Sequence, residues 1–425
     1  MANTIAIVDR RSFLRSAAAG TGLALLGSAV WTQPAQAQQR LFGNLMRPDA
    51  NGVRLPEGFT SRIIATTGQI VGDTGYEWHP NPDGGAVFAQ PDGGWIYVSN
   101  DEASDEQGGA SMVRFDADAN IIDARSILSG TSRNCAGGAT PWGTWLSCEE
   151  FGRGRVWECD PTGENPAVVR EAMGIFLHEA AACDDNRQQI YMTEDHREGL
   201  LYRFTPNTWG DLSEGVLEGM VETGGGGVGW AVIDDPSARN RTTRRMVDNP
   251  MIFAGGEGAW FDDPYLYFTT KRDTRVWRYN AESNELEVIY DIETAPNPVL
   301  DGVDNVVVSA NGDLYVCEDG GNMEVVVLGA NGAVHPFLRL TGFNGSEVTG
   351  AAFDPSGTRM YVSSQRNPGV TFEITGPFLG DQAQAPPPAA REPEANETEA
   401  NEPEANEPEA NEPSGGHVGS AGKFQ

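Results

Sequence analysis

One sequence feature constrains the fold of this chain more than any other: a unit of strands and tight turns that recurs along its middle. Five copies are clear, and they begin near positions 135, 179, 257, 304 and 347. The starts are 44, 78, 47 and 43 residues apart, and the longest interval contains a Gly- and Arg-rich insertion around 224–245. Repeats of about 40–50 residues that each hold several strands are typical of β-propeller blades.

Each copy has the same internal order. A residue able to bind a metal comes first, a strand, a turn and a second strand follow, and a small polar or acidic cluster ends the unit. The second strands are rich in aromatic and β-branched residues, as in Tyr265–Phe268 and Leu314–Val316. A degenerate sixth copy ends at 99–102.

Because one four-stranded blade cannot bury both of its faces, we expect these units to pack around a shared axis. The predicted fold class is all-β, a six-bladed β-propeller with a metal site in its central channel. Leu55–Ile64 is expected to add a strand beside Val370–Ile374 and so close the ring. A jelly roll or a sandwich is the alternative, but it explains the regular recurrence less well.

The N-terminal residues differ from this repeating core. Arg10–Leu14 forms a twin-arginine pattern, Ala17–Val30 is an apolar stretch of 14 residues, and Ala35–Ala37 offers the small residues that a signal peptidase reads. A stretch of this length is too short to span a membrane, which takes about 20 residues. We therefore expect 1–37 to be a signal peptide for the twin-arginine translocase. The protein should be periplasmic or secreted, with no membrane anchor.

The C-terminal residues also differ from the core. Residues 383–425 repeat Glu, Pro, Ala and Asn with few apolar residues, which predicts a disordered acidic tail. The remaining domain, 38–382, is long enough for one large hydrophobic core. The net charge is −32 and the tail supplies only nine of the 61 acidic residues, so the core is itself strongly acidic. Such a surface excludes nucleic acid as a partner. We expect a monomer.

The first residues of the clear copies are candidate metal ligands. They are Cys135, Glu179, Glu257, Asp304 and Glu347. Each sits where the strand that would line the channel begins, so the side chains should converge at one mouth of the channel. An uncompensated buried carboxylate costs several kcal/mol, so such a group must hold protons or cations. Each acid alone would usually be a solvated turn residue, but their recurrence at one repeat position favours a polynuclear metal site.

The ligand types indicate which metals this site would bind. Carboxylates suit Ca²⁺, whereas a thiolate needs a transition metal, and iron accepts both ligand types. The four histidines of the core, at 79, 178, 196 and 335, are not spaced as zinc ligands. A second acidic set ends the copies, and its members could be ligands or exposed residues: Glu149, Glu150, Glu194, Asp195, Glu318 and Asp319.

The chain has five cysteines, an odd number, so at least one cannot be in an intramolecular disulfide. Cys159 and Cys183 could pair in an oxidising compartment, and the sequence leaves this open.

Several segments together resemble a known family. The longest is Asn134–Glu150, which reads NCAGGATPWGTWLSCEE. Shorter ones are His178–Ala180, Tyr191–Asp195, Leu201–Phe204, Asp304–Asn305, Cys317–Gly320 and Glu347–Gly350. With these segments, nearly the whole core is similar to the PhoX-type alkaline phosphatases.

This resemblance implies a twin-arginine-exported propeller that hydrolyses phosphate monoesters, acting on small phosphorylated substrates with Fe³⁺ and Ca²⁺. It implies that Cys135 ligates iron. The implied carboxylate ligands are Glu179, Glu257, Asp304, Glu347 and either Glu149 or Glu150. The sequence departs from the family at 100–102, which reads Asn-Asp-Glu in place of Asn-His-Glu, and its core is more compact.

The expected chemistry is metal-assisted hydrolysis, because neither a Ser-His-Asp arrangement nor a P-loop is apparent in the sequence. Arg133 and Lys271 are the candidate catalytic residues that would hold phosphate oxygens, and Arg272 is a further candidate. Two alternatives stay open. One is a calcium-dependent propeller hydrolase of another class, such as a lactonase, which would leave Cys135 without a role. The other is a metal-binding propeller without activity.

Overall fold

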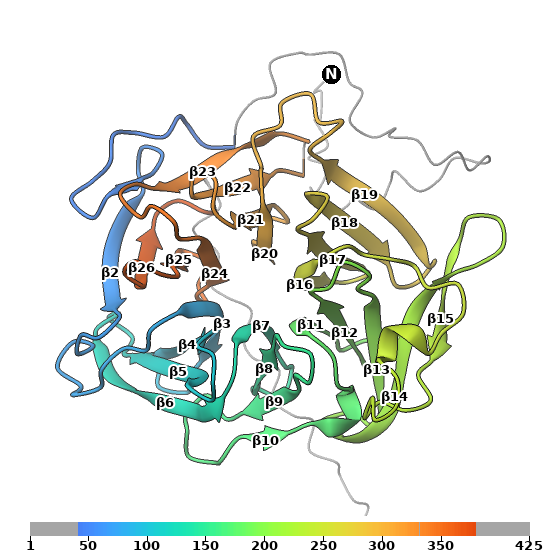
Figure 1. Ribbon diagram of the computed structural model, residues 1–425. Helices are drawn as coiled ribbons and strands as arrows, with labels where there is room; N and C mark the ends of the chain where they lie inside the picture. The colour runs from blue at the N-terminus through green and yellow to red at the C-terminus, as the bar shows by residue number, and fades with distance from the viewer. Residues whose placement is uncertain (1–40, 331, 380–425) are drawn as a thin grey trace, which may run out of the picture. The chain divides into compact units, whose positions relative to one another are not determined.

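The structure is a computed structural model that describes residues 41–330 and 332–379. Within these ranges the chain forms six antiparallel sheets arranged around a central axis (Figure 1). The predicted six-bladed β-propeller is therefore confirmed. The expected signal peptide, 1–37, and the acidic tail, 383–425, lie outside the described residues. Inside them, no helix has both the length and the apolar character needed to cross a membrane.

The first three blades follow one another along the chain. The first consists of β3 (Pro82–Ala89), β4 (Trp95–Asp101), β5 (Gly108–Phe115) and β6 (Ile121–Thr131). The second consists of β7 (Asn134–Ala139), β8 (Trp145–Glu149), β9 (Val156–Cys159) and β10 (Val168–Val169), followed by the 3₁₀ turn η1 (Glu171–Met173). The third consists of β11 (His178–Asp184), β12 (Gln189–Glu194), β13 (Leu201–Thr208), β14 (Asp211–Glu222) and β15 (Val228–Val232), followed by η2 (Thr243–Arg245).

The last three blades include strands from the N-terminal part of the chain. The fourth consists of β16 (Gly256–Asp262), β17 (Tyr265–Thr270), β18 (Arg275–Asn280) and β19 (Glu285–Asp291). The fifth consists of β20 (Val303–Val308), β21 (Leu314–Glu318), β22 (Glu324–Leu328) and β23 (Val334–Leu340), with β1 (Val53–Arg54) at its edge. The sixth consists of β24 (Val348–Phe353), β25 (Arg359–Ser364), β26 (Val370–Thr375) and β2 (Thr60–Thr66).

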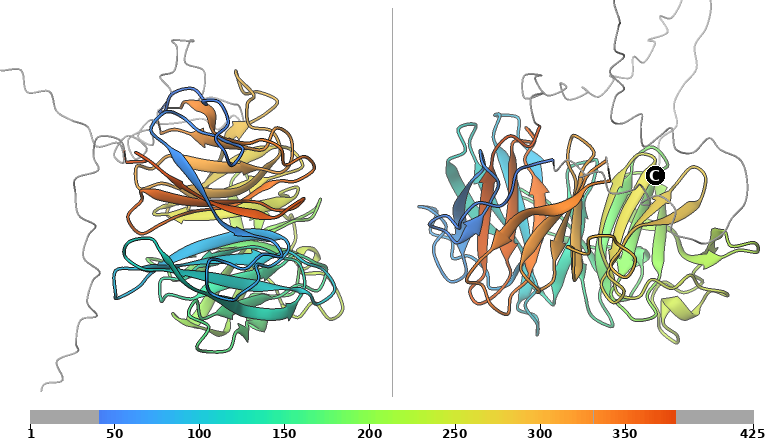
Figure 2. Two further views of the ribbon diagram at one scale, coloured as in Figure 1. Left: turned by 90° about the vertical axis from the view of Figure 1, so that its left-hand side faces the viewer. Right: turned by 90° about the horizontal axis from the view of Figure 1, so that it is seen from above.

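The ring closes through the N-terminal strand β2. It pairs antiparallel with β26, so that Ser61 lies opposite Ile374. The predicted closure is thus confirmed, although the strand begins at Thr60 and not at Leu55. The innermost strands β3, β7, β11, β16, β20 and β24 each contact the next, and β24 contacts β3. In the side views of Figure 2 the strands run roughly along the central axis.

The hydrophobic core lies between neighbouring blades. Val325 from the fifth blade and Phe372 from the sixth are fully buried in one shared cluster. All five cysteines lie in the described ranges as free thiols, so Cys159 and Cys183 form no disulfide there. Cys148 and Cys159 are buried in hydrophobic clusters between blades. Packing therefore accounts for them without a chemical role.

Each innermost strand carries a register shift close to its start. The shifts lie between Pro82 and Gly85, Asn134 and Gly137, His178 and Ala181, Gly256 and Ala259, Val303 and Val306, and Thr349 and Ala352. A β-bulge re-aims the side chains around it, and bulges are common beside active sites. All six blades can therefore present a side chain to the channel at the same level.

Glycines beside these bulges let the innermost strands approach one another closely. A Cβ atom on Gly138 would lie 1.7 Å from the Ala181 carbonyl oxygen, and one on Gly84 would lie 2.5 Å from the Ala136 Cα. Neither position has room for a side chain. The innermost strands therefore lie in close backbone contact near their starts.

We predict that Gly138→Ala lowers the free energy of unfolding by about 1–3 kcal/mol, the usual cost of overpacking, because backbone must move to admit the methyl group. Denaturant unfolding checks this. Gly152→Ala is the matched control, since no atom lies within 4 Å of its added Cβ. Equal stability of the two variants would contradict the close packing of β7 against β11.

Candidate metal centre

The second residue of each innermost strand is the main source of candidate ligands. In blade order these residues are Asp83, Cys135, Glu179, Glu257, Asp304 and Thr349. Four of the five ligands expected from the repeat thus share one structural position. Glu347 does not, because it precedes β24 and lies two residues before the equivalent Thr349. The expectation that all five share one repeat position is corrected there.

Asp83 was missed by the sequence analysis, which treated the first copy as degenerate at its start. The signal was present, because Asp83 is followed by Gly84-Gly85-Ala86 as Glu257 is followed by Gly258-Ala259. Asp83 is buried, at 1% exposure, and its Oδ2 accepts a hydrogen bond of 2.5 Å from Gln365 Nε2. It therefore supplies the acid of the first blade.

The residues that directly follow the second strand of each blade form a further set. In blade order these are Glu102, Glu150, Asp195, Lys271, Asp319 and Gln365. They include acids that the sequence analysis left open and Glu102, which it did not propose. Polar or charged side chains thus enter the channel from two positions in every blade.

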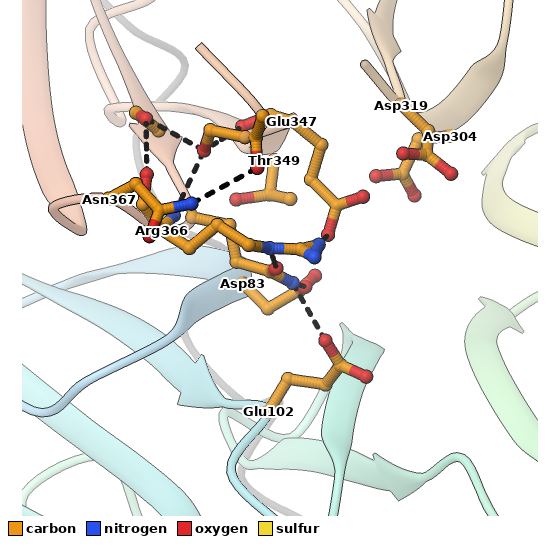
Figure 3. A network of polar contacts seen from close by, with 12 residues as sticks. Asp83, Glu102, Asp304, Asp319, Glu347, Thr349, Arg366 and Asn367 are labelled. Carbon is orange, nitrogen blue, oxygen red and sulfur yellow. Dashed lines mark hydrogen bonds and ion pairs between the residues drawn. The ribbon is translucent and has the colours of Figure 1, made fainter. Parts of the chain in front are cut away.

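Three groups of these residues could each hold a cation, since one ligand atom from every member lies within 4.8 Å of the others. The first group is Glu102, Cys135 and Glu150. The second is Asp83, Glu102 and Glu347, and the third is Glu179, Glu257 and Asp304. Glu102 belongs to two groups and so links them. Figure 3 shows Asp83, Glu102, Glu347 and Asp304 around the channel.

Glu149 lies outside these groups, unlike its neighbour Glu150. Its carboxylate accepts hydrogen bonds from the backbone N–H groups of Ser132 at 3.3 Å and Arg155 at 3.2 Å, and from Arg155 Nε at 3.2 Å. Consecutive strand residues point to opposite sides, so only one of the two can face the channel. Of the two alternatives, the geometry places Glu150 among the candidate ligands.

The last residue of the second strand has the same role in the other acidic pairs. Glu194 accepts hydrogen bonds from Leu200 N at 3.2 Å and the Tyr202 hydroxyl at 3.0 Å. Glu318 accepts them from the backbone of Asp301 and Glu324, both at 3.0 Å. Asp101, which stands where the family that the sequence resembles has His, likewise accepts hydrogen bonds from Asn81 N and Ala103 N at 3.2 Å. These acids hold loops in place beneath the rim.

The buried carboxylates lack enough protein donors. Glu179 is fully buried, and neither of its oxygens has a hydrogen-bond partner among the described residues. Burial, and then the charge of Glu102, raises the pKa of Asp83 to about 7. Burial raises the pKa of Glu150 to about 8 and that of Glu347 to about 9. Cations in these groups would displace the protons and satisfy Glu179, so the donor set fits a cluster of bound metal ions.

Both candidate catalytic residues lie at this centre. Lys271 Nζ is 3.0 Å from Glu257 Oε1 and 3.2 Å from Asp319 Oδ2. Burial lowers the pKa of Lys271, but the negative charges of Glu257 and its neighbours outweigh this and raise it, so the ammonium stays charged. Arg133 Nη2 lies 2.7 Å from Glu150 Oε2 and 3.4 Å from Glu102 Oε1.

Arg366 is a third cation at the centre, and the sequence analysis did not propose it. Its guanidinium pairs with Glu347, and its Nε donates to Gln365 Oε1 at 2.6 Å (Figure 3). Arg366 directly follows Gln365, as Arg272 follows Lys271. This equivalent place in the repeat was the sequence signal that could have identified it.

Comparison with known proteins gives the family. The family model described as alkaline phosphatase PhoX matches residues 107–156, 152–226 and 267–369, together more than half of the chain. The chain belongs to the PhoX family of alkaline phosphatases. It is therefore an enzyme of the phosphatase class, as the resemblance predicted. The matched segments include most of the candidate ligands, but Asp83, Glu102 and Glu257 lie outside them.

One solved structure supports the fold. The structure of Pseudomonas fluorescens PhoX in complex with vanadate, a transition state analogue, is 18% identical with a TM-score of 0.65, over 79% of this chain and 98% of that chain. A gluconolactonase from Xanthomonas campestris is 13% identical with a TM-score of 0.49, over 80% of this chain and 99% of that chain. A sequence search of curated proteins finds no match.

The adjacent acids Glu149 and Glu150 give a matched test of the two positions. We predict that Glu150→Gln lowers the amount of bound metal without destabilising the metal-free protein. Glu149→Gln should instead lower the free energy of unfolding by about 1–3 kcal/mol, because it weakens buried charged hydrogen bonds. Metal content and denaturant unfolding separate these effects. The assignment of Glu150 to metal binding and of Glu149 to loop support is wrong if Glu149→Gln loses metal as completely as Glu150→Gln does.

Proposed function

We propose that the chain hydrolyses phosphate monoesters with iron and calcium ions bound in its central channel. The observation that carries this proposal is the meeting of the Cys135 thiol with Glu102 and Glu150 beside two groups of carboxylates alone. A thiolate selects a transition metal, for which Fe³⁺ is our proposal, whereas oxygen-only groups suit Ca²⁺. Membership of the phosphatase family supports the reaction.

The three groups suit a cluster rather than isolated ions. Glu102 is common to the thiolate group and to the group of Asp83 and Glu347, so its two oxygens could serve neighbouring cations. When bound, such cations would neutralise charge that develops on the phosphoryl oxygens and activate water. The protein contributes fixed positions for these charges, because the ligands lie on the bulged innermost strands or at the ends of strands in packed blades.

Lys271 and Arg133 would bind the phosphate oxygens. Both are charged, and both are paired with candidate ligands, Lys271 with Glu257 and Arg133 with Glu150. When the carboxylates bind cations, they compete less for these basic groups, which can then turn to the substrate. Arg366, paired with Glu347, stands in the same relation to a candidate ligand. The three cations would hold a small phosphorylated substrate and orient it toward the ligand groups.

We further propose that the protein is exported by the twin-arginine route, which carries folded proteins and would allow iron to bind before export. Arg10–Leu14 supports this. Replacing Arg10 and Arg11 by Lys should retain the precursor in the cytoplasm, as cell fractionation would show. Normal export of that double variant would contradict the proposal.

Cys135→Ala tests the thiolate ligand. We predict that it removes most of the iron and most of the phosphatase activity, because no other thiol lies in a ligand group of the described residues. Cys183→Ala is the control, since Cys183 is a free thiol packed against a hydrophobic cluster. Iron per chain and the rate of p-nitrophenyl phosphate hydrolysis are the measurements. If the two variants behave alike, Cys135 is a packing residue only.

Calcium removal tests the oxygen-only groups. We predict that chelation stops phosphatase turnover and that added Ca²⁺ restores it, because the acids of these groups cannot act without counter-charge. Full activity after exhaustive chelation would contradict the proposal. Calcium without iron, together with lactone hydrolysis and no phosphatase activity, would favour the lactonase alternative.

A further inference from the structure

The third blade carries an Arg-rich segment at residues 239–245 that the phosphatase chemistry does not use. It reads RNRTTRR and lies between β15 and β16, and the family model leaves this stretch, 227–266, unmatched. In Figure 1 the chain returns here from the outer edge of the third blade to the innermost strand of the fourth. The segment thus lies outside the part of the chain that the family model matches.

Hydrogen bonds fix this segment beside the metal centre. Arg244 pairs with the buried Glu194, and Thr243 Oγ1 lies 2.8 Å from the Tyr202 hydroxyl, which donates to Glu194 Oε2 at 3.0 Å. Glu194 is the last residue of β12 and directly precedes Asp195 of the channel set. The segment is therefore held at the rim, with Arg244 as its anchor.

A second arginine, Arg272, reaches the same part of the rim from the fourth blade. Its Nη2 lies 3.7 Å from Asp195 Oδ1. A Cβ on Gly255 would lie 3.0 Å from Arg272 Cγ and 3.2 Å from Asp195 Oδ1, so both side chains pack over this glycine. Gly255 N donates to His196 O at 2.9 Å, and Lys271 N donates to Gly255 O at 2.7 Å. The rim loops of the third and fourth blades are tied together there.

Arg245, which follows the anchor Arg244, and Arg272 both remain open to solvent, and each pairs with one carboxylate. The side chains of Arg245 and Arg272 are 64% and 53% exposed. Arg245 pairs with the exposed Glu198, whose backbone N–H donates to His196 Nδ1 at 3.0 Å. Asp195, the partner of Arg272, has an Oδ1 that accepts no hydrogen bond from residues 41–330 or 332–379. On a chain of net charge −32, this is a place where an anion can approach the channel.

We propose that Arg245 and Arg272 bind a second phosphate group of the substrate while the scissile phosphate lies in the channel. The inference rests on the proposed function. It names the class of substrate that the enzyme would prefer, which is phosphate esters whose leaving group carries another phosphate. Arginine suits this task, because its planar guanidinium can donate two parallel hydrogen bonds to phosphate. Exposed carboxylate partners such as Glu198 are easily exchanged for such a ligand.

The test compares glucose 1,6-bisphosphate with glucose 6-phosphate as substrates of the full, metal-loaded protein. We expect the wild type to have the higher kcat/KM for the bisphosphate. Arg245→Ala and Arg272→Ala should each lower kcat/KM for the bisphosphate by about tenfold more than for the monophosphate, as expected for one charged hydrogen bond. Most of the change should appear in KM. Arg125→Ala, on the outer strand β6 of the first blade, is the control and should leave the ratio unchanged.

The outcomes separate this inference from the proposed function. If the wild type hydrolyses both sugars and neither Arg variant alters their ratio, the second phosphate site is wrong and the phosphatase proposal stands. If the wild type hydrolyses neither phosphate ester, the proposed function fails and the inference fails with it.

Discussion

Mutual repulsion of acidic groups in the central channel is the constraint on which the rest of this structure depends. Asp83, Glu179, Glu257 and Asp304 come from four different blades and are nearly or fully buried. Each needs either a proton or a cation, and water cannot supply the missing stabilisation at that depth. The glycines beside the bulges, the close approach of the innermost strands and the basic residues at the rim all serve to keep these groups together.

Two adjacent residues at the end of the second strand of a blade have different roles. The last strand residue is turned into the blade, where Glu149, Glu194 and Glu318 accept hydrogen bonds from backbone N–H groups. The next residue faces the channel, as Glu150 does. In the second blade, Glu149 thus holds loops in place and its neighbour Glu150 is a candidate ligand. The two acids of such a pair therefore have different roles.

The sequence predicted the blades because strand and turn composition recurred at a nearly constant spacing, and it predicted the convergence of Cys135, Glu179 and Asp304 from their shared place in that unit. It missed Asp83, because Asp-Gly-Gly also reads as a turn, and the likeness of this segment to Glu257-Gly258-Ala259 was the only signal that it begins a strand. It could not choose between Glu149 and Glu150 either. Which side of the strand each faces is set by the pairing of β8 with β7, where Asn134 lies opposite Glu149.

A crystal structure with anomalous diffraction recorded on both sides of the iron absorption edge tests the central claim most directly. The account predicts an iron peak bounded by Cys135, Glu102 and Glu150, with further cation density among Glu179, Glu257 and Asp304. A channel that contains only water in protein purified with its native metals, with the acids turned apart, would contradict it.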